Sequence, residues 1–451
     1  MLYEKKTAGI YTLGCKVNQY ESEAIAEELA KNGVTVLPPT EVCDAYIINT
    51  CTVTAESDRK ARQFIRRAIA KNPEARIVVT GCLAQTAPRS VAAIDGVDAV
   101  IGNVEKLAAA QAALTLLNEK KKNDAPKIEV EDINVAGFEQ MRISSFGRTR
   151  AYIKIEDGCE NRCAYCIIPS ARGKIRSKAP EAVLEEIRAL TENGCREVVL
   201  TGIETASYGK DRSDTDLGSL LAQVDKIEGI GRVRLGSLDP SLIRPDFVER
   251  IASLSSLAPH FHLSLQSGSS RILAKMKRKY NAEQAMNAIR LLRAAIPNVK
   301  FTTDVIVGFP SETEEDFAET LRFCEEARFL MVHIFPYSKR EGTLAATMAE
   351  QVPTEVKRQR LHRLEARTKE IRRELLTEAI ASSPVTEVLF ETYENGYAYG
   401  HTADFLEVAV PSDAPLHGRL GTVCLQALTG DVCHGRLMEL LQNERDGKGE
   451  V

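Results

Sequence analysis

Three cysteines, Cys159, Cys163 and Cys166, have the spacing in this chain that most directly implies chemistry. They form a Cys-x3-Cys-x2-Cys run, and no fourth cysteine lies close to them in the sequence. Three thiolates can hold an iron-sulfur cube and leave its fourth iron open to another ligand. The run therefore predicts a metal centre that takes part in a reaction, because a centre that only stores an electron needs no open iron.

A second set of three cysteines lies in the N-terminal part of the chain. Cys15, Cys51 and Cys82 each follow directly after a short run of β-forming residues. Parallel strands end along one edge of a sheet, where ligands bind in open α/β folds, so thiols 36 and 31 residues apart can meet there. This repetition favours a metal site over three buried thiols that only pack. Zinc and a second open iron-sulfur cluster are both compatible with the pattern.

The other five of the eleven cysteines show no such arrangement. They lie before a strand, at a helix-to-strand turn, within a helix, or in the β-rich C-terminal region, and we predict packing roles for them. They are Cys43, Cys195, Cys324, Cys424 and Cys433.

The elements that must position the two cysteine sets fall into an α/β pattern. Alternating strands and helices predict an N-terminal parallel α/β domain over residues 1–122, followed at 123–148 by a linker or a strand pair that crosses to the next domain. Six strand-helix repeats in residues 149–376 predict a partial (βα)6 barrel with its active site at the carboxyl ends of the strands. Five short β-runs in residues 377–445 predict a small β-barrel.

The expected strands can be read from β-rich runs bounded by turn residues. In the first two domains they are 9–13, 45–49, 76–80, 99–101, 152–155, 197–200, 232–236, 261–265, 301–307 and 331–335. The longest expected helices are 19–32, 54–71, 104–122, 180–192, 314–327 and 355–376.

The length, the apolar runs and the net charge of the chain restrict the kind of protein that it can be. The 451 residues are enough for about three domains, and no run reaches the ~18 apolar residues that a membrane span needs. We therefore expect a cytoplasmic protein. Because the formal net charge is −4, a nucleic-acid partner must be held by local basic patches.

Two basic segments and the C-terminal region bear on that partner. Residues 355–376 carry eight Lys or Arg side chains, and residues 271–279 carry five. Each could contact phosphates or be an ordinary solvated helix face. Residues 377–451 carry twelve acidic side chains and four Lys or Arg, so RNA binding there would need one face, with Tyr393, Tyr397, Tyr399 and Phe405 stacking on bases.

The Cys159 run resembles the motif of the radical S-adenosylmethionine superfamily, because it follows a predicted strand and has Tyr165 just before its last cysteine. The resemblance implies a [4Fe-4S] cluster on Cys159, Cys163 and Cys166, whose open iron binds the amino and carboxylate groups of S-adenosylmethionine. One electron then splits the sulfonium and gives a 5′-deoxyadenosyl radical, so that the cofactor supplies the difficult chemistry.

With the N-terminal cysteines and the C-terminal barrel included, nearly the whole chain resembles the methylthiotransferases of that superfamily. The resemblance implies that Cys15, Cys51 and Cys82 hold an auxiliary [4Fe-4S] cluster that carries the sulfur, and that the barrel is an RNA-binding TRAM-like domain. It also implies an electron donor such as flavodoxin or ferredoxin. The sulfur source is unknown.

Residues 14–22 and 335–343 resemble the MtaB type, which modifies N6-threonylcarbamoyladenosine at position 37 of tRNA. An isopentenyladenosine-type enzyme would show Gly-Cys-Gln-Met-Asn at the first segment, and a ribosomal-protein type would act on an aspartate. Both stay as alternatives, and a zinc-holding RNA-binding protein without catalysis is a third. That third class does not explain why each cysteine set lacks a fourth ligand.

Five residues are expected around S-adenosylmethionine on the basis of the resemblance: Tyr165, Gly202, Glu204, Gln266 and Gly308. Two positions depart from the family pattern, because histidine is expected at 204 and glycine at 311. Glu204 could meet the amino group of the cofactor, meet the substrate, or be a solvated loop residue. Ser311 is compatible with a helix N-cap.

Overall fold

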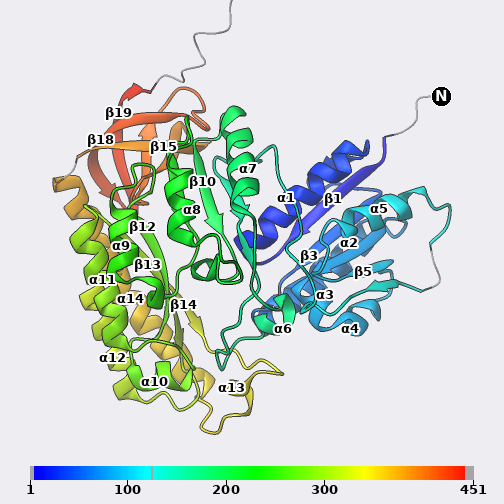
Figure 1. Ribbon diagram of the computed structural model, residues 1–451, viewed down its shortest axis with the longest axis horizontal. Helices are drawn as coiled ribbons and strands as arrows, with labels where there is room; N and C mark the ends of the chain where they lie inside the picture. The colour runs from blue at the N-terminus through cyan, green and yellow to red at the C-terminus, as the bar shows by residue number, and fades with distance from the viewer. Residues whose placement is uncertain (1–4, 123–124, 383, 442–451) are drawn as a thin grey trace, which may run out of the picture.

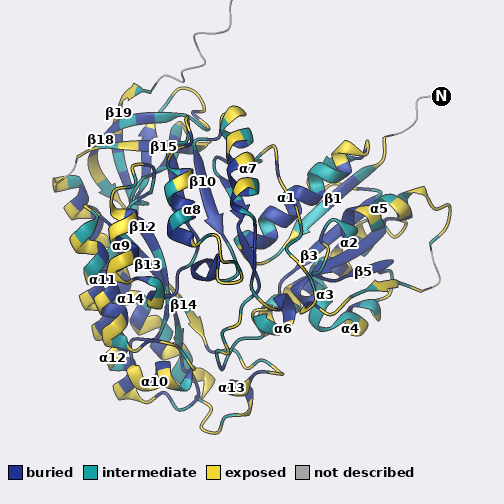
Figure 2. Ribbon diagram, viewed as in Figure 1, coloured by how far each residue is buried: buried dark blue, intermediate teal, exposed yellow. Residues whose placement is uncertain are grey.

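A computed structural model describes residues 5–122, 125–382 and 384–441 (Figure 1). An N-terminal α/β unit and a larger central α/β unit lie side by side, and a small β-barrel lies at one end of the central unit (Figure 1). The central strands of both α/β units are buried, whereas β14 is partly exposed and the helices turn an exposed face outward (Figure 2). None of the helices in these ranges is both long and apolar enough to cross a membrane.

The N-terminal unit is one parallel sheet of six strands in the order β2-β1-β3-β4-β5-β6. Its central strands are continuous runs such as Tyr46-Ile47-Ile48, buried on both faces because helices cover both sides of the sheet. The strands are β1 (Thr7–Thr12), β2 (Thr35–Leu37), β3 (Ala45–Thr50), β4 (Arg76–Gly81), β5 (Ala99–Ile101) and β6 (Lys127–Glu129). The helices are α1 (Lys16–Lys31), α2 (Ala55–Lys71), α3 (Cys82–Thr86), α4 (Pro88–Ala92) and α5 (Ala108–Asn118).

The sequence did not locate the two edge strands of this sheet. β6 lies within the segment 123–148, predicted as a linker or a crossing strand pair, and it pairs in parallel with β5 of the N-terminal sheet. β2 pairs with β1 at the opposite edge. Each is three residues long, which is too short for an alternating pattern to stand out. The segment after β5 therefore completes the sheet before the chain crosses to the central unit.

The central unit confirms all six expected strands as a partial parallel barrel. β7, β10 and β11 form one sheet and β12, β13 and β14 another, and parallel bridges at Val233–Leu257 and Leu238–Leu263 join them. The strands are β7 (Ala151–Lys154), β10 (Glu197–Thr201), β11 (Arg232–Leu235), β12 (His260–Gln266), β13 (Lys300–Val307) and β14 (Met331–Pro336), with the short pair β8 (Glu156–Asp157) and β9 (Arg176–Ser177).

The longer helices of the central unit pack on the outer face of this half-barrel: α7 (Pro180–Glu192), α8 (Leu217–Val224), α9 (Pro245–Ala252), α11 (Ala282–Ala295) and α12 (Glu314–Ala327). Three short helices lie elsewhere: α6 (Ile168–Arg172) contacts α3, and α10 (Ser270–Lys275) and α13 (Leu344–Thr347) pack with the loop of the three cysteines. On β12, Phe261, Leu263 and Leu265 belong to the core shared with the longer helices. Because strand side chains alternate, the residues between them, such as His262, face the inside of the half-barrel.

Helix α14 (Thr354–Ser382) leads to a closed barrel in the order β15-β16-β17-β19-β18. This confirms the predicted small β-barrel. Its strands are β15 (Val385–Glu394), β16 (Tyr397–Thr402), β17 (Glu407–Pro411), β18 (Leu420–Thr429) and β19 (Val432–Leu440).

The C-terminal barrel closes the amino end of the half-barrel with Phe405. The Phe405 ring stacks between His260, the first residue of β12, and His401, with ring centroids 4.5 and 4.8 Å away. The Arg234 guanidinium lies 5.0 Å from the centroid of the same ring. Phe405 is therefore engaged inside the protein, and the expectation that it stacks on an RNA base is wrong.

Candidate active site

Cys159, Cys163 and Cys166 lie in the loop that follows β7 and β8, at the carboxyl end of the half-barrel. The loop is held by backbone hydrogen bonds: Cys159 N donates to Gly173 O (2.9 Å), and Ala164 N donates to Met276 O (2.9 Å). All three cysteines are partly exposed. They therefore face the open end of the half-barrel, where the sequence placed an active site.

Charged neighbours favour an anionic group at these sulfurs. Arg278 Nη1 donates to Cys163 Sγ (3.3 Å), and Arg278 Nη2 donates to Asp239 Oδ2 (2.8 Å). Burial raises the pKa of both Cys159 and Cys166 to about 12, so the thiols ionise only with a compensating cation. Three thiols without a fourth protein sulfur fit an iron-sulfur cube with one open iron, since bound iron deprotonates its thiols.

Cys15, Cys51 and Cys82 follow β1, β3 and β4, at one edge of the N-terminal sheet. A side chain at Gly14 would bring its Cβ within 3.1 Å of Cys51 Sγ, so the loop of Cys15 lies directly on Cys51. Asn18 joins these loops, because its Nδ2 donates to Leu13 O (2.7 Å) and to Thr50 O (3.0 Å). The fold thus gathers the three thiols that the sequence spreads over 68 residues.

Three of the six cysteines follow a position whose backbone conformation only glycine adopts without strain. Gly14, Gly81 and Gly158 have φ angles of +109°, +99° and +95°, a region that other residues rarely adopt. At Gly158 a Cβ would lie 1.9 Å from Lys174 O, so there is no space for any side chain. The chain turns sharply there, and the following cysteine points away from the strand that precedes it.

A buried ionic network lies between the two cysteine sets. Glu21 on α1 accepts from Arg172 Nη1 (2.5 Å) and pairs with Lys154 Nζ (3.1 Å) and Lys106 Nζ (3.3 Å). Asp157 pairs with Lys154 (3.2 Å) and Arg172 (3.3 Å). Although burial opposes ionisation, Arg172, Lys106 and Lys154 hold the pKa of Glu21 well below its usual range. All five side chains are nearly inaccessible to solvent. Burial lowers the pKa of Lys106, whereas the neighbouring cations hold the pKa of Asp157 below its usual value.

This network contacts both sites. Arg172 Nε donates to Cys82 Sγ (3.3 Å), and Asp157 lies two residues before Cys159. Sequence reasoning did not find it. One signal was available, because Glu21 lies on the apolar face of α1 between Val17, Tyr20 and Ile25, where a charged residue needs a buried partner.

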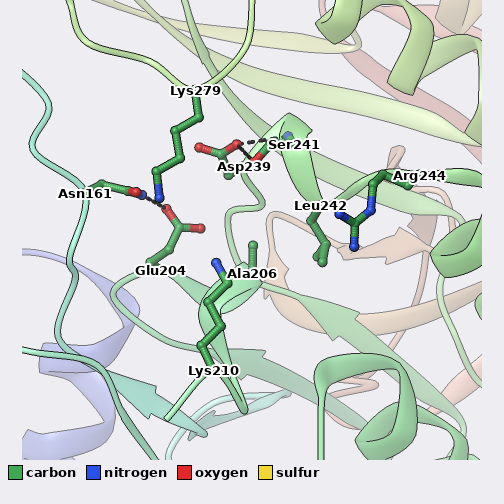
Figure 3. A pocket seen from close by; sticks show the side chains of 9 residues that line it. All are labelled: Asn161, Glu204, Ala206, Lys210, Asp239, Ser241, Leu242, Arg244 and Lys279. Carbon is green, nitrogen blue, oxygen red and sulfur yellow. Dashed lines mark hydrogen bonds between the residues drawn. The ribbon is translucent and has the colours of Figure 1, made fainter.

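A cavity of about 240 Å³ opens beside the loop of Cys159 (Figure 3). Glu204 lines it and accepts a hydrogen bond from Asn161 Nδ2 (3.3 Å). Burial, with a smaller contribution from Asp239, raises the pKa of Glu204 to about 7. Its lining residues are Asn161, Glu204, Ala206, Lys210, Asp239, Ser241, Leu242, Arg244 and Lys279.

The other residues expected around S-adenosylmethionine lie around the same end of the half-barrel. Gly202 follows β10, Gln266 ends β12 and Gly308 follows β13. A Cβ at Gly202 would lie 2.5 Å from Glu156 Oε2, which explains glycine there by space alone. Burial raises the pKa of Tyr165 well above its usual value, so this phenol stays neutral. These four residues do not line the cavity of Figure 3.

Ser311 is not the helix N-cap that the sequence suggested. Thr313 caps α12 and accepts from Asp316 N, whereas Ser311 has a φ angle of +66°. The glycine expected at this position would adopt that angle without strain. Ser311 Oγ instead accepts a hydrogen bond from Lys275 Nζ (2.5 Å).

Acidic partners occupy two of the five cations in residues 271–279 and most of the arginines on α14. In residues 271–279, Arg271 pairs with Asp316 and Arg278 is buried against Asp239. On α14 most of the arginines pair with acidic residues of the same helix or of neighbouring elements: Arg358–Glu355, Arg360–Glu312, Arg363–Glu314, Arg367–Glu325 and Arg372–Asp431. This favours the solvated-face interpretation of α14 over phosphate contacts.

With the geometry established, comparison with known proteins gives the class. Residues 153–324 match the radical SAM superfamily, and residues 7–102 match a family described as "Uncharacterized protein family UPF0004". A cobalamin- and [4Fe-4S]-bound radical S-adenosylmethionine methyltransferase, TsrM from Kitasatospora setae, has a similar fold, with a TM-score of 0.55 at 15% identity over 76% of this chain and 77% of that one. The fold and the cysteine loop define a radical S-adenosylmethionine enzyme.

Relatives in sequence give the family. The threonylcarbamoyladenosine tRNA methylthiotransferase MtaB of Bacillus subtilis is 38% identical over 97% of this chain and 98% of its own length. The protein of the same name from Thermotoga maritima is 40% identical over 81% and 82%. A tRNA-2-methylthio-N(6)-dimethylallyladenosine synthase of Desulfitobacterium hafniense is 35% identical over 92% and 93%. This chain therefore belongs to the radical S-adenosylmethionine methylthiotransferase family.

Proposed function

We propose that this protein is a tRNA methylthiotransferase that adds a methylthio group to C2 of N6-threonylcarbamoyladenosine at position 37. The observation that carries the proposal is the pair of three-cysteine sites on facing units, joined through Arg172 and Asp157. The MtaB relatives, which match nearly the whole chain, support this choice of substrate over the dimethylallyl nucleoside. The product would be 2-methylthio-N6-threonylcarbamoyladenosine.

Each cysteine set has a separate role in this proposal. Cys159, Cys163 and Cys166 would hold a [4Fe-4S] cluster that binds S-adenosylmethionine at its open iron, and Cys15, Cys51 and Cys82 would hold an auxiliary [4Fe-4S] cluster. With these groups bound, the protein gains radical cleavage of an unactivated C–H bond and a source of sulfur.

The chain's own residues orient these groups. Arg278 and Arg172 each donate a hydrogen bond to one cysteine sulfur and so fix its position. Glu204, Tyr165, Gly202, Gln266 and Gly308 would surround S-adenosylmethionine at the carboxyl end of the half-barrel, with Glu204 facing its amino group.

The proposal extends to partners and location. A tRNA substrate implies the cytoplasm, and the radical step requires a one-electron donor such as flavodoxin or ferredoxin. The C-terminal barrel would contact the RNA through Tyr393, Tyr397 and Tyr399, since Tyr393 keeps an exposed ring and the rings of Tyr397 and Tyr399 lie 6.5 Å apart.

Nucleoside mass spectrometry of tRNA tests the assignment. A strain without the gene should lack 2-methylthio-N6-threonylcarbamoyladenosine and retain 2-methylthio-isopentenyladenosine. The gene supplied on a plasmid should restore the first nucleoside. Loss of the isopentenyl product instead would contradict the substrate, and no change in either would contradict the function.

A further inference from the structure

Three polar side chains meet on the inner face of the half-barrel, away from the cysteines. His262 on β12, Asp304 on β13 and His333 on β14 each bring one nitrogen or oxygen atom within 4.8 Å of the others. His262 Nε2 lies 3.3 Å from Asp304 Oδ2, and the His262 and His333 rings have centroids 5.9 Å apart. Asp304 and His333 are direct partners in the register of β13 and β14. The strand pairing therefore fixes the trio in place.

The orientation of the His262 ring is set from the other side. Its Nδ1 lies 2.9 Å from Thr302 Oγ1, which in turn lies 3.1 Å from Nε2 of the buried His260. This chain of contacts holds the His262 ring with Nε2 turned toward Asp304. Strand register and these hydrogen bonds therefore fix His262 and Asp304, which are partly buried, beside the exposed His333.

The trio lies between the two cysteine sets. Ser264, two residues after His262 on the same face of β12, has its carbonyl oxygen bonded by Arg278 Nη2 (3.0 Å), and Arg278 also donates to Cys163. From the opposite unit, the Lys16 ammonium acts electrostatically on Asp304 and His333, and Lys16 is the neighbour of Cys15.

The loop after β14 contacts the N-terminal unit. Arg340 Nη1 donates to Asp58 Oδ2 (2.6 Å), and Arg340 also bonds Thr52, the residue after Cys51. The loop after β14 therefore lies against the N-terminal unit next to Cys51.

An aromatic ring on this face is available to a planar ligand. Val332 and Ile334 pack into the core, so His333 and Phe335 lie on the inner face of β14. Phe335 is 45% exposed, although it is a large apolar side chain inside the half-barrel. Aromatic rings in such positions stack on unpaired RNA bases.

We propose that His262, Asp304, His333 and Phe335 form the pocket for the modified base, an inference that rests on the proposed function. Phe335 stacks on the adenine, while the trio recognises the substituent on N6. A threonylcarbamoyl group offers N–H, hydroxyl and carboxylate groups. Asp304 accepts from the donors, and His333 and Lys16 face the carboxylate. A dimethylallyl group offers none of these and would leave the polar atoms of the trio without a partner on the ligand.

Binding of short RNA to the cluster-reconstituted enzyme under anaerobic conditions tests the pocket. The probes are two anticodon stem-loops that differ only in carrying N6-threonylcarbamoyladenosine or adenosine at position 37. The wild-type protein should prefer the first. His333→Ala and Asp304→Asn should each weaken binding of the first by about tenfold and leave the second unchanged. Phe335→Ala should weaken both by about tenfold.

His362→Ala is the matched control, because His362 is exposed on α14 and should change neither affinity. Iron content and the thermal unfolding midpoint of each variant establish that it is folded and loaded. If the wild type discriminates and makes product, but both trio variants discriminate equally well, the inference is overturned while the proposed function stands. If the wild type neither discriminates nor makes product, both are overturned. Stoichiometric zinc that His333→Ala removes from the reconstituted enzyme would also overturn it, because two histidines and a carboxylate can hold a metal ion.

Discussion

The two cysteine sites of this protein have the same number of sulfurs but opposite construction. Cys159, Cys163 and Cys166 lie within one eight-residue loop, so their proximity is local. Cys15, Cys51 and Cys82 come from three strand ends and meet only when β1, β3 and β4 pair. The first site can be recognised from a local sequence motif, whereas the second forms only when the sheet has folded.

At both sites, nevertheless, a buried arginine donates a hydrogen bond to one cysteine sulfur. Arg278 serves Cys163 and is balanced by one buried carboxylate, Asp239. Arg172 serves Cys82 and is balanced by two, Glu21 and Asp157. The site assembled by tertiary structure therefore carries the larger ionic network, and that network also ties it to the other unit.

The largest expected effects are on the reaction products, and they differ according to which cysteine site is changed. Replacing any of Cys159, Cys163 and Cys166 with alanine should abolish 5′-deoxyadenosine formation and methylthio transfer together. Replacing Cys15, Cys51 and Cys82 should abolish methylthio transfer and halve the iron content, while 5′-deoxyadenosine is still formed. Liquid chromatography of the reaction products and iron analysis measure this. Loss of both activities in the second set would mean that the two sites do not act separately.

The next largest expected effect is on the free energy of unfolding, and it differs between Arg172 and Arg278. Arg172→Met removes one cationic partner from two buried carboxylates, Glu21 and Asp157, and should lower the free energy of unfolding by about 3 kcal/mol. Arg278→Met leaves one carboxylate and should cost less. Urea denaturation monitored by circular dichroism measures both. Arg290→Met is the control, since its pair with Glu326 is exposed and should have no measurable effect. Equal losses at the two arginines would contradict the difference between the networks.

Carboxylates beside the two sites should respond to pH in opposite directions. The pKa of Glu204 is raised to about 7, so its ionisation opposes folding, and stability is lost as pH rises from about 4.5 to about 7. The pKa of Glu21 is held low, so its contribution is lost only as pH falls below about 4.5.

Glu204→Gln isolates the first of these contributions. The variant should become more stable than the wild type at pH 8 by on the order of 1 kcal/mol, with little difference at pH 4.5. Thermal unfolding midpoints across this pH range measure it. A constant difference at every pH would show that the effect comes from packing and not from the charge of Glu204.

The smallest expected effect concerns the loop after β13. Glycine occupies the positive-φ positions before Cys15, Cys82 and Cys159, but Ser311 occupies one near the open end of the half-barrel. Ser311→Gly should relieve strain and lose the bond from Lys275, for a net stabilisation of about 0.5 kcal/mol. The thermal midpoint should rise slightly. A lower midpoint would mean that the Lys275 contact outweighs the strain.

Sequence patterns predicted those features that depend on residues close together in the chain. The six strands of the half-barrel and the helix 314–327 appear as expected, because continuous apolar runs and a capped amphipathic helix leave a strong periodic signal. The convergence of Cys15, Cys51 and Cys82 also followed from strand-end positions. That these six cysteines bind two clusters stays a prediction.

Long-range charge pairing could not be predicted in the same way. Glu21 and Arg172 are 151 residues apart, and nothing in the spacing of either tells which partner it will meet. The same holds for His262, Asp304 and His333, whose meeting depends on the register of three strands. The short edge strands β2 and β6 were missed because three residues carry too little pattern.

The stacking of Phe405 between His260 and His401 has a consequence for how the protein can be divided. The C-terminal barrel is anchored on the amino end of the half-barrel, where Arg232 also donates to His401 O and Arg234 donates to Thr402 O. A shortened chain that ends before residue 385 would uncover His260 and leave both guanidinium groups without these acceptors. Removal of the barrel should therefore destabilise the central unit itself.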